Sequence, residues 1–302
     1  MKRSLLARLR TNGIAYILGA LLLLLLSPLY QLLALGPLGY NLALSATTSG
    51  HFGIYVNWIH THVFSFLLYR VQSLLAIVLL LSLPFTLFRV IVAQELVAQQ
   101  EREAEVAAQE EDEEFDEEEA EDGDEEFDDD EVADEEFDGE EQNEENEEQA
   151  DDDGMPPYAW RGKGFAVIAA WSGISGLVVY LLGSLASTCY LLLVSGTTPS
   201  ADLGFWYVFF TLVTNTVGIG LLSLSTLFFG AMIARAGVRL WPPVWVFFGY
   251  TALVVAALFS GSAVAVASAP TSQAILTGPA ILLFASWVLW LGVMLVRLKP
   301  EE

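Results

Sequence analysis

The chain has 302 residues, of which 54% are hydrophobic, and a formal net charge of −25. This hydrophobic content is too high for an ordinary soluble domain and is typical of a protein with several apolar membrane spans. A single cysteine, Cys189, excludes an intrachain disulfide framework and a thiolate metal cluster.

The charged residues are divided sharply between two kinds of sequence. Residues 95–153 hold 35 of the 38 acidic side chains, whereas the rest of the chain has 12 basic and 3 acidic residues and a net charge of +9. No charged side chain occurs between Arg10 and Arg70, or between Arg239 and Arg297. Charge is therefore absent where the chain would lie in hydrocarbon, which predicts an integral membrane protein with one acidic insertion.

Six stretches are long enough to cross a bilayer, which requires about 20 mostly apolar residues. In chain order they cover about 14–35, 71–92, 164–193, 204–234, 243–267 and 274–296. The first is interpreted as an uncleaved anchor, because no small-residue cleavage site follows its leucine run. We therefore predict an all-α, six-span transmembrane bundle with an N-terminal membrane part (1–93), an acidic loop (94–157) and a C-terminal membrane part (158–302).

The basic residues predict an orientation, because they gather on the cytoplasmic side of short loops. With the N-terminus inside, six spans place twelve of the thirteen basic residues in the cytoplasm. Only Arg70 falls outside, at the outer mouth of the second span. We expect a multi-pass protein of the cell membrane whose two termini and acidic loop are cytoplasmic.

The loop before the second span contains all three histidines of the chain, His51, His60 and His62. Imidazole is the commonest transition-metal ligand, and His-x-His in an extended segment points both rings the same way. This predicts a metal site. The alternative is that His60 and His62 lie with Tyr55 and Trp58 at the outer membrane interface, where amphipathic rings are favoured. Whether the segment is interfacial or re-entrant stays open.

The acidic loop has too few large apolar residues to fold alone, so residues 103–153 are expected to form a largely disordered coil. The pentapeptide Asp-Glu-Glu-Phe-Asp occurs three times and supplies three aromatic docking candidates, Phe115, Phe127 and Phe137. These repeats suggest docking onto basic cytoplasmic proteins, or they arise from slippage in a low-complexity tract. The segment 110–153 would also attract divalent cations, though diffusely, since it lacks a glycine-pinned calcium loop.

The fourth span contains a run that resembles the selectivity filter of potassium channels: Thr216, Val217, Gly218, Ile219 and Gly220. In such channels backbone carbonyls replace the water shell of the ion. The acidic residue expected after the filter is absent here, and the apolar stretch 221–234 is too short for an inner helix. The alternative is one long helix with small residues and threonines on a packing face.

Small residues recur at four-residue spacing in the later spans. In the fifth span there are two such stripes: Ala252, Ala256 and Ser260 form one, and Ala257, Gly261 and Ala265 form the other. Small residues let helix backbones approach closely in lipid. The stripes therefore predict a compact bundle or an oligomer.

Catalytic signals are weak in this chain. The run Gly173-Ile174-Ser175-Gly176 resembles the nucleophile motif of rhomboid intramembrane proteases, but the histidine base that this chemistry needs is missing after His62. No aspartate, glutamate, lysine or histidine lies within a predicted span, although most catalytic and proton-coupled sites require one. We expect no cofactor and no nucleic-acid partner.

Two segments, about 230–250 and 281–298, resemble uncharacterised prokaryotic multi-span membrane proteins. The resemblance lies in the join from Arg235 to Pro243, which includes Trp241, and in the closing run from Trp287 to Arg297. It implies a small bacterial or archaeal inner-membrane protein without an assigned reaction, and it carries no functional residue over. The sequence therefore favours a non-enzymatic scaffold or regulator that uses its acidic loop, with a transporter or channel subunit as the alternative and a histidine-metal enzyme as a third reading.

Overall fold

The computed structural model describes residues 3–97, 164–196, 202–268 and 273–297. Helices account for the regular structure of these residues, and no strand occurs among them. The chain divides into two units, one comprising Met1–Ile91 with Gly164–Glu302 and the other Val92–Lys163. The three phenylalanines of the acidic repeats and the whole of 110–153 lie outside the described residues.

Six helices of the described chain are long and apolar enough to cross a membrane, and they indicate a multi-pass membrane protein. They cover Ala7–Leu35, Val63–Val97, Gly164–Ser195, Leu203–Val238, Pro243–Ser268 and Leu276–Arg297. The predicted number of spans and the all-helical fold are confirmed.

The second of these helices begins at Val63 rather than near residue 71. The helix therefore begins before the predicted start of this span and includes Arg70. Residues 63–69 are mostly apolar and continue the helix, so at about 1.5 Å per residue Arg70 lies about 10 Å inside its first residue. The lone charge is part of the helix and does not mark its end.

The spans are built from the following elements. The first comprises α1 (Arg3–Leu21), the π-helical η1 (Leu22–Leu26), α2 (Ser27–Tyr30) and the π-helical η2 (Gln31–Leu35). The second comprises α5 (Val63–Leu80) and a helical segment over 83–97, and the third is α7 (Gly164–Ser195). The fourth comprises α8 (Leu203–Leu212), the π-helical η4 (Val213–Gly218) and α9 (Ile219–Leu240). The fifth and sixth are α10 (Pro243–Ser268) and α11 (Gln273–Arg297).

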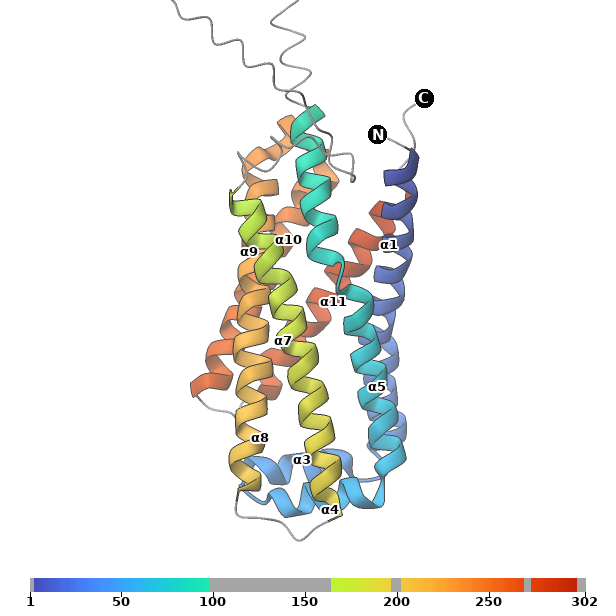
Figure 1. Cartoon of the computed structure of the whole chain (residues 1–302), viewed down its shortest axis with the longest axis vertical. Helices are drawn as coiled ribbons and strands as arrows, with labels where there is room; N and C mark the ends of the chain where they lie inside the picture. The colour runs from blue at the N-terminus through green and yellow to red at the C-terminus, as the bar shows by residue number, and fades with distance from the viewer. Residues whose placement is uncertain (1–2, 98–163, 197–201, 269–272, 298–302) are drawn as a thin grey trace, which may run out of the picture. The chain divides into compact units, whose positions relative to one another are not determined.

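The spanning helices form a ring that follows chain order (Figure 1). Helix α1 packs against α5, α5 against α7, α7 against α9, α9 against α10, and α10 against α11. Helix α11 closes the ring by packing back against α1. Every span can therefore contribute side chains to the interior of the ring.

Glycines set the distance between neighbouring helices at two crossings of the ring. A Cβ added to Gly13 of α1 would lie 2.9 Å from the carbonyl oxygen of Gly292 in α11. A Cβ added to Gly230 of α9 would likewise lie 2.9 Å from the carbonyl oxygen of Gly249 in α10. These approaches are closer than side chains permit, which is the packing expected where lipid provides no hydrophobic drive between helices.

One of the two small-residue stripes of α10 packs against α9 over most of its length. Ala252 and Ala256 are buried, and the hydroxyl of the exposed Ser260 lies 2.6 Å from the hydroxyl of Ser223 in α9. The other stripe faces outward, since Ala257 and Gly261 are exposed.

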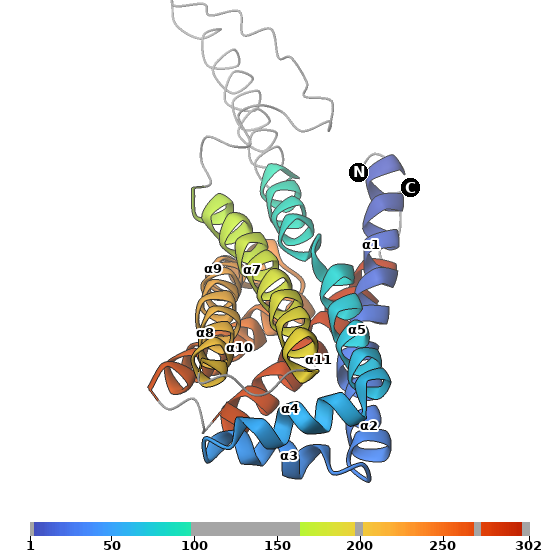
Figure 2. The ribbon, with the colours of Figure 1, turned by 60° about the horizontal axis from the view of Figure 1, so that its bottom comes forward.

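The segment between the first and second spans folds into two short helices, α3 (Tyr40–Thr48) and α4 (Phe52–Thr61), that lie across one end of the ring (Figure 2). This is the end away from the start of α1 and the finish of α11. Buried aromatic side chains hold the two helices together: the rings of Tyr40 and Trp58 meet edge-on at 5.0 Å, and Trp58 Nε1 donates a hydrogen bond to the carbonyl of Leu38 at 2.7 Å. We call this pair of helices the cap.

The second span is interrupted at Leu81 and Ser82, which precede Pro84 by three and two residues. Proline has no backbone N–H and disrupts the helical ladder at this point. Side chains of α1 supply polar partners there: the hydroxyl of Tyr16 lies 2.9 Å from that of Ser82 and 2.6 Å from that of Thr86. These bonds satisfy the side-chain hydroxyls at the break within the bundle, as polar groups in hydrocarbon require.

Candidate functional site: a central cavity beside an arginine

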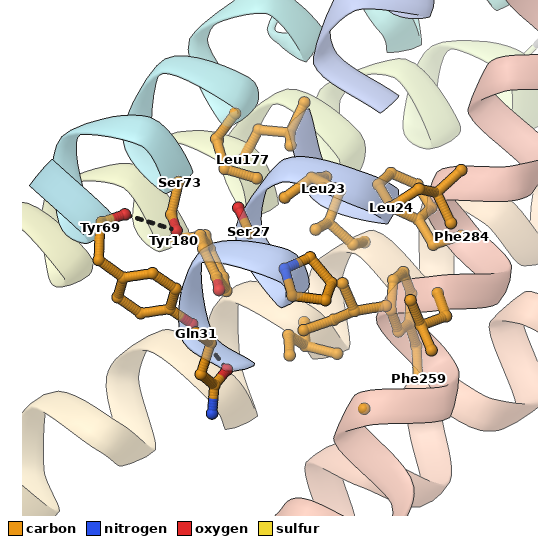
Figure 3. Close-up of a pocket in the computed structure, with 17 residues that line it drawn as sticks. Leu23, Leu24, Ser27, Gln31, Tyr69, Ser73, Leu177, Tyr180, Phe259 and Phe284 are labelled. Carbon is orange, nitrogen blue, oxygen red and sulfur yellow. Dashed lines mark hydrogen bonds between the residues drawn. The ribbon is translucent and has the colours of Figure 1, made fainter. Parts of the chain in front are cut away.

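A cavity of about 560 Å³ lies inside the ring, and all six spans contribute to its lining (Figure 3). Small-molecule sites in proteins have volumes of about 300–1,000 Å³, so the cavity has the size of a ligand site. On the first span its wall is formed by η1, α2 and η2, where π-turns flank Pro28. Such π-helical turns within α-helices occur frequently at functional sites.

Most of the cavity wall is apolar. Leu24 from the first span, Leu177 from α7, Phe259 from α10 and Phe284 from α11 supply aliphatic and aromatic surface. In Figure 3, Leu24 and Phe284 lie on the side of the cavity away from Tyr69. This wall suits a hydrocarbon chain.

Polar side chains gather on the other side of the cavity: Ser27, Gln31, Tyr69, Ser73 and Tyr180 (Figure 3). The Tyr69 hydroxyl donates a hydrogen bond to Oε1 of Gln31 at 3.4 Å, and the Ser73 hydroxyl donates one to the Tyr69 carbonyl at 3.0 Å. Hydroxyl groups thus dominate this side. The cavity is therefore amphipathic.

Arg70 follows Tyr69 in the chain and lies beside the polar side of the cavity. Its guanidinium carbon is 5.3 Å from the centroid of the Phe66 ring, a cation–π geometry. Four tyrosines lie close enough to interact with it electrostatically: Tyr40, Tyr55, Tyr69 and Tyr180. Arg70 does not itself line the cavity, but two of its electrostatic neighbours, Tyr69 and Tyr180, do.

Arg70 has no anionic partner among the described residues. The described chain contains two carboxylates, Glu95 and Asp202, and the electrostatic neighbours of Arg70 are tyrosines instead. Its Nε atom is buried and makes no hydrogen bond to any described residue. An unsatisfied buried donor costs about 1–3 kcal/mol, and more when the group is charged. A cation held in a span at this cost is a functional candidate.

Burial raises the pKa of Tyr55 and raises that of Tyr40 well above its usual value. The Arg70 charge opposes this effect in both residues without overcoming it. Both phenols are therefore neutral at physiological pH. They can offer hydroxyl dipoles to the guanidinium but no compensating negative charge.

The structure does not bring the three histidines together. His51 immediately precedes α4 and is exposed, His60 is exposed on α4, and the His62 ring stacks on Trp58 at 4.9 Å between centroids. Residues 52–61 are helical, so the extended geometry assumed for His60 and His62 does not occur. Within the described chain, no three His, Cys, Asp or Glu side chains are grouped as metal ligands.

The filter-like run lies within a continuous helix formed by α8, η4 and α9. Thr216 and Val217 are π-helical, and Gly220 is in α9. Only Ile219 of the five residues lines the cavity. In a helix the backbone carbonyls point along the helix axis and accept hydrogen bonds from the next turn. This segment therefore has the geometry of one long helix, the alternative to a filter.

No protein-family model matches the chain, and no curated protein or solved structure does so either. Reasoning from the sequence named Arg70 only as a marker of orientation and did not connect it with a site or with these tyrosines. The available signal was the lone charge between Arg10 and Arg89, in a stretch otherwise suited to lipid.

Proposed function

We propose that this protein is a non-enzymatic, multi-pass protein of the cell membrane that binds a single-chain amphiphile in its central cavity and moves or senses it there. The observation that supports this is the cavity lined by all six spans, with a hydrocarbon-like wall facing a group of hydroxyls. A lipid-like molecule matches both surfaces at once. The cavity lining contains no carboxylate, histidine or cysteine that would act as a nucleophile or general base.

The basic residues support an orientation for this proposal, with both termini in the cytoplasm. The cap of α3 and α4 would then lie on the outer side. Arg70, near the cap, would lie in the outer part of the membrane. An amphiphile from the outer leaflet would find its polar partners at this depth.

The test uses the purified full-length chain in nanodiscs and two radiolabelled probes, monooleoylglycerol and oleate. Gly278 lines the cavity, and a Cβ added there would meet no atom within 4 Å, so Gly278→Leu adds bulk at the cavity from a backbone position with open surroundings. Gly261 in α10 has the same open surroundings but does not line the cavity, so Gly261→Leu is the matched control. We expect saturable binding that Gly278→Leu weakens and Gly261→Leu leaves unchanged. Failure of both probes to bind saturably would reject the proposal.

A second candidate function is a cytoplasmic scaffold, in which 110–153 recruits basic proteins or divalent cations. The density of acidic residues and the three phenylalanine-bearing repeats support it. Deleting 110–153 should abolish co-purification of basic partners while leaving probe binding in the cavity intact. Mutating Phe115, Phe127 and Phe137 to Ala together separates docking at the repeats from attraction to the charge alone: partners that persist in this variant are held by charge.

A further inference from the structure

Among the groups near the cavity, one charge has no counterpart. Arg70 is a permanent cation, and no carboxylate in the described chain interacts with it electrostatically. Its buried Nε has no acceptor. The tyrosines around it are neutral dipoles, which solvate a guanidinium only in part. The site therefore contains a positive charge and an unused donor that the described protein does not satisfy.

The position of this cation relative to the cavity is favourable for a ligand. Tyr69 and Tyr180 belong both to the cavity lining and to the electrostatic neighbours of Arg70. A head group placed beside the hydroxyls of Tyr69 and Tyr180 would contact two of the side chains that interact electrostatically with the guanidinium. Hydroxyls donate to anionic oxygens, and a nearby cation in a poorly screened site strengthens that attraction.

The charges around the cavity also favour one sign of charge on the ligand's head group. No acidic side chain lines the cavity, so nothing there would attract a cationic head group or repel an anionic one. The opposite wall, with Leu24, Phe259 and Phe284, accommodates an apolar chain. The complementary molecule has one hydrocarbon chain and a negatively charged head.

We infer that the cavity selects single-chain amphiphiles with an anionic head group, and that Arg70 is the fixed countercharge that recognises that head. This inference rests on the proposed function and adds the ligand class to it. The anionic oxygens could belong to a carboxylate, as in a fatty acid, or to a phosphate, as in a lysophospholipid. Both present oxygens to the same hydroxyls and the same guanidinium.

The experiment compares four probes with the same eighteen-carbon chain in nanodiscs of neutral phosphatidylcholine: oleate, lysophosphatidate, neutral monooleoylglycerol and cationic oleylamine. The wild-type chain should bind oleate or lysophosphatidate at least roughly tenfold more tightly than monooleoylglycerol, and oleylamine most weakly. Tighter binding of oleate would identify a carboxylate head group, and tighter binding of lysophosphatidate would identify a phosphate. Equal affinities for anionic and neutral probes would overturn the inference while leaving the cavity function standing. Failure of all four probes to bind would reject both.

The role of Arg70 is tested with Arg70→Gln and Arg70→Lys. The glutamine variant should bind anionic and neutral probes equally, and the lysine variant should retain part of the preference because it keeps the charge without the planar fork. Arg89→Gln, which removes the same charge near the other end of the same span, is the control and should preserve the preference. Persistence of the preference in a folded Arg70→Gln protein would overturn the assignment to Arg70. If that variant does not fold, Tyr180→Phe decides the matter, since loss of its hydroxyl should weaken anionic probes selectively and an equal effect on neutral probes would contradict the inference.

Discussion

Gly176 and Gly218 lie against each other where α7 crosses η4. A Cβ added to Gly176 would be 2.9 Å from the carbonyl oxygen of Gly218, and one added to Gly218 would be 3.3 Å from the carbonyl oxygen of Gly176. Gly176 belongs to the run that resembles the rhomboid nucleophile motif, and Gly218 belongs to the run that resembles a potassium-channel filter. Close packing of the two helices is a structural reason for a glycine at both positions.

This contact predicts that Gly176→Leu destabilises the protein. The new side chain meets backbone of η4 and α9, which cannot move aside as a side chain can, so overpacking of about 1–3 kcal/mol is expected. Thermal unfolding in detergent measures the loss. Gly261→Leu, at a helical glycine with open surroundings, should leave the unfolding temperature nearly unchanged. Similar stability of the two variants would show that the crossing is looser than described.

The hydrogen bonds at the break of the second span predict an effect of Tyr16→Phe. The substitution removes a buried hydroxyl that lies within 3 Å of both Ser82 and Thr86 and leaves the ring in place. Hydrogen bonds between spans contribute about 0.6 kcal/mol on average and up to about 1.7. We expect a loss in this range by steric trapping in a bilayer mimic. Tyr250→Phe, at an exposed ring, is the control, and an equal loss there would contradict the interpretation.

The cap predicts a local effect of Trp58→Phe. Phenylalanine keeps an aromatic ring against Tyr40 but removes the N–H that donates to the Leu38 carbonyl at 2.7 Å. We expect faster amide hydrogen exchange in α3 and α4, with little change in the spanning helices, because the lost bond joins α4 to the turn just before α3. Trp171→Phe, at an exposed indole of α7, should change neither region. Faster exchange throughout the bundle would contradict a local role.

The buried tyrosines of the cap predict sensitivity to alkaline pH. Burial raises the pKa of Tyr40 and Tyr55 above the unfolded value of about 10, so the unfolded state loses these protons first. Stability is therefore unaffected below pH about 10 and falls as the pH rises further. Phenolate absorbance should show delayed ionisation that Tyr55→Phe partly removes. Ionisation of all ten tyrosines near pH 10 in the folded protein would refute this prediction.

The sequence determined the number of spans, because a run of about 20 residues without charge has few alternatives to crossing a bilayer. It also identified one stripe that packs inside the bundle, since Ala252 and Ala256 are buried in α10. The stripe with Ala257 and Gly261 has the same spacing, yet it faces outward. In lipid, helix faces toward the core and toward the membrane are both apolar, so periodicity alone does not separate them.

The cavity and the surroundings of Arg70 were decided only by the tertiary structure. Charge patterning located Arg70 but assigned it to the end of a span, because a charge in apolar sequence has the same signature at an edge and in the interior. Its tyrosine neighbours come from α3, α4, α5 and α7, segments that meet only when the ring closes and the cap folds across it. Local sequence thus sets which residues enter the membrane, while contacts between distant segments determine which of them share a site.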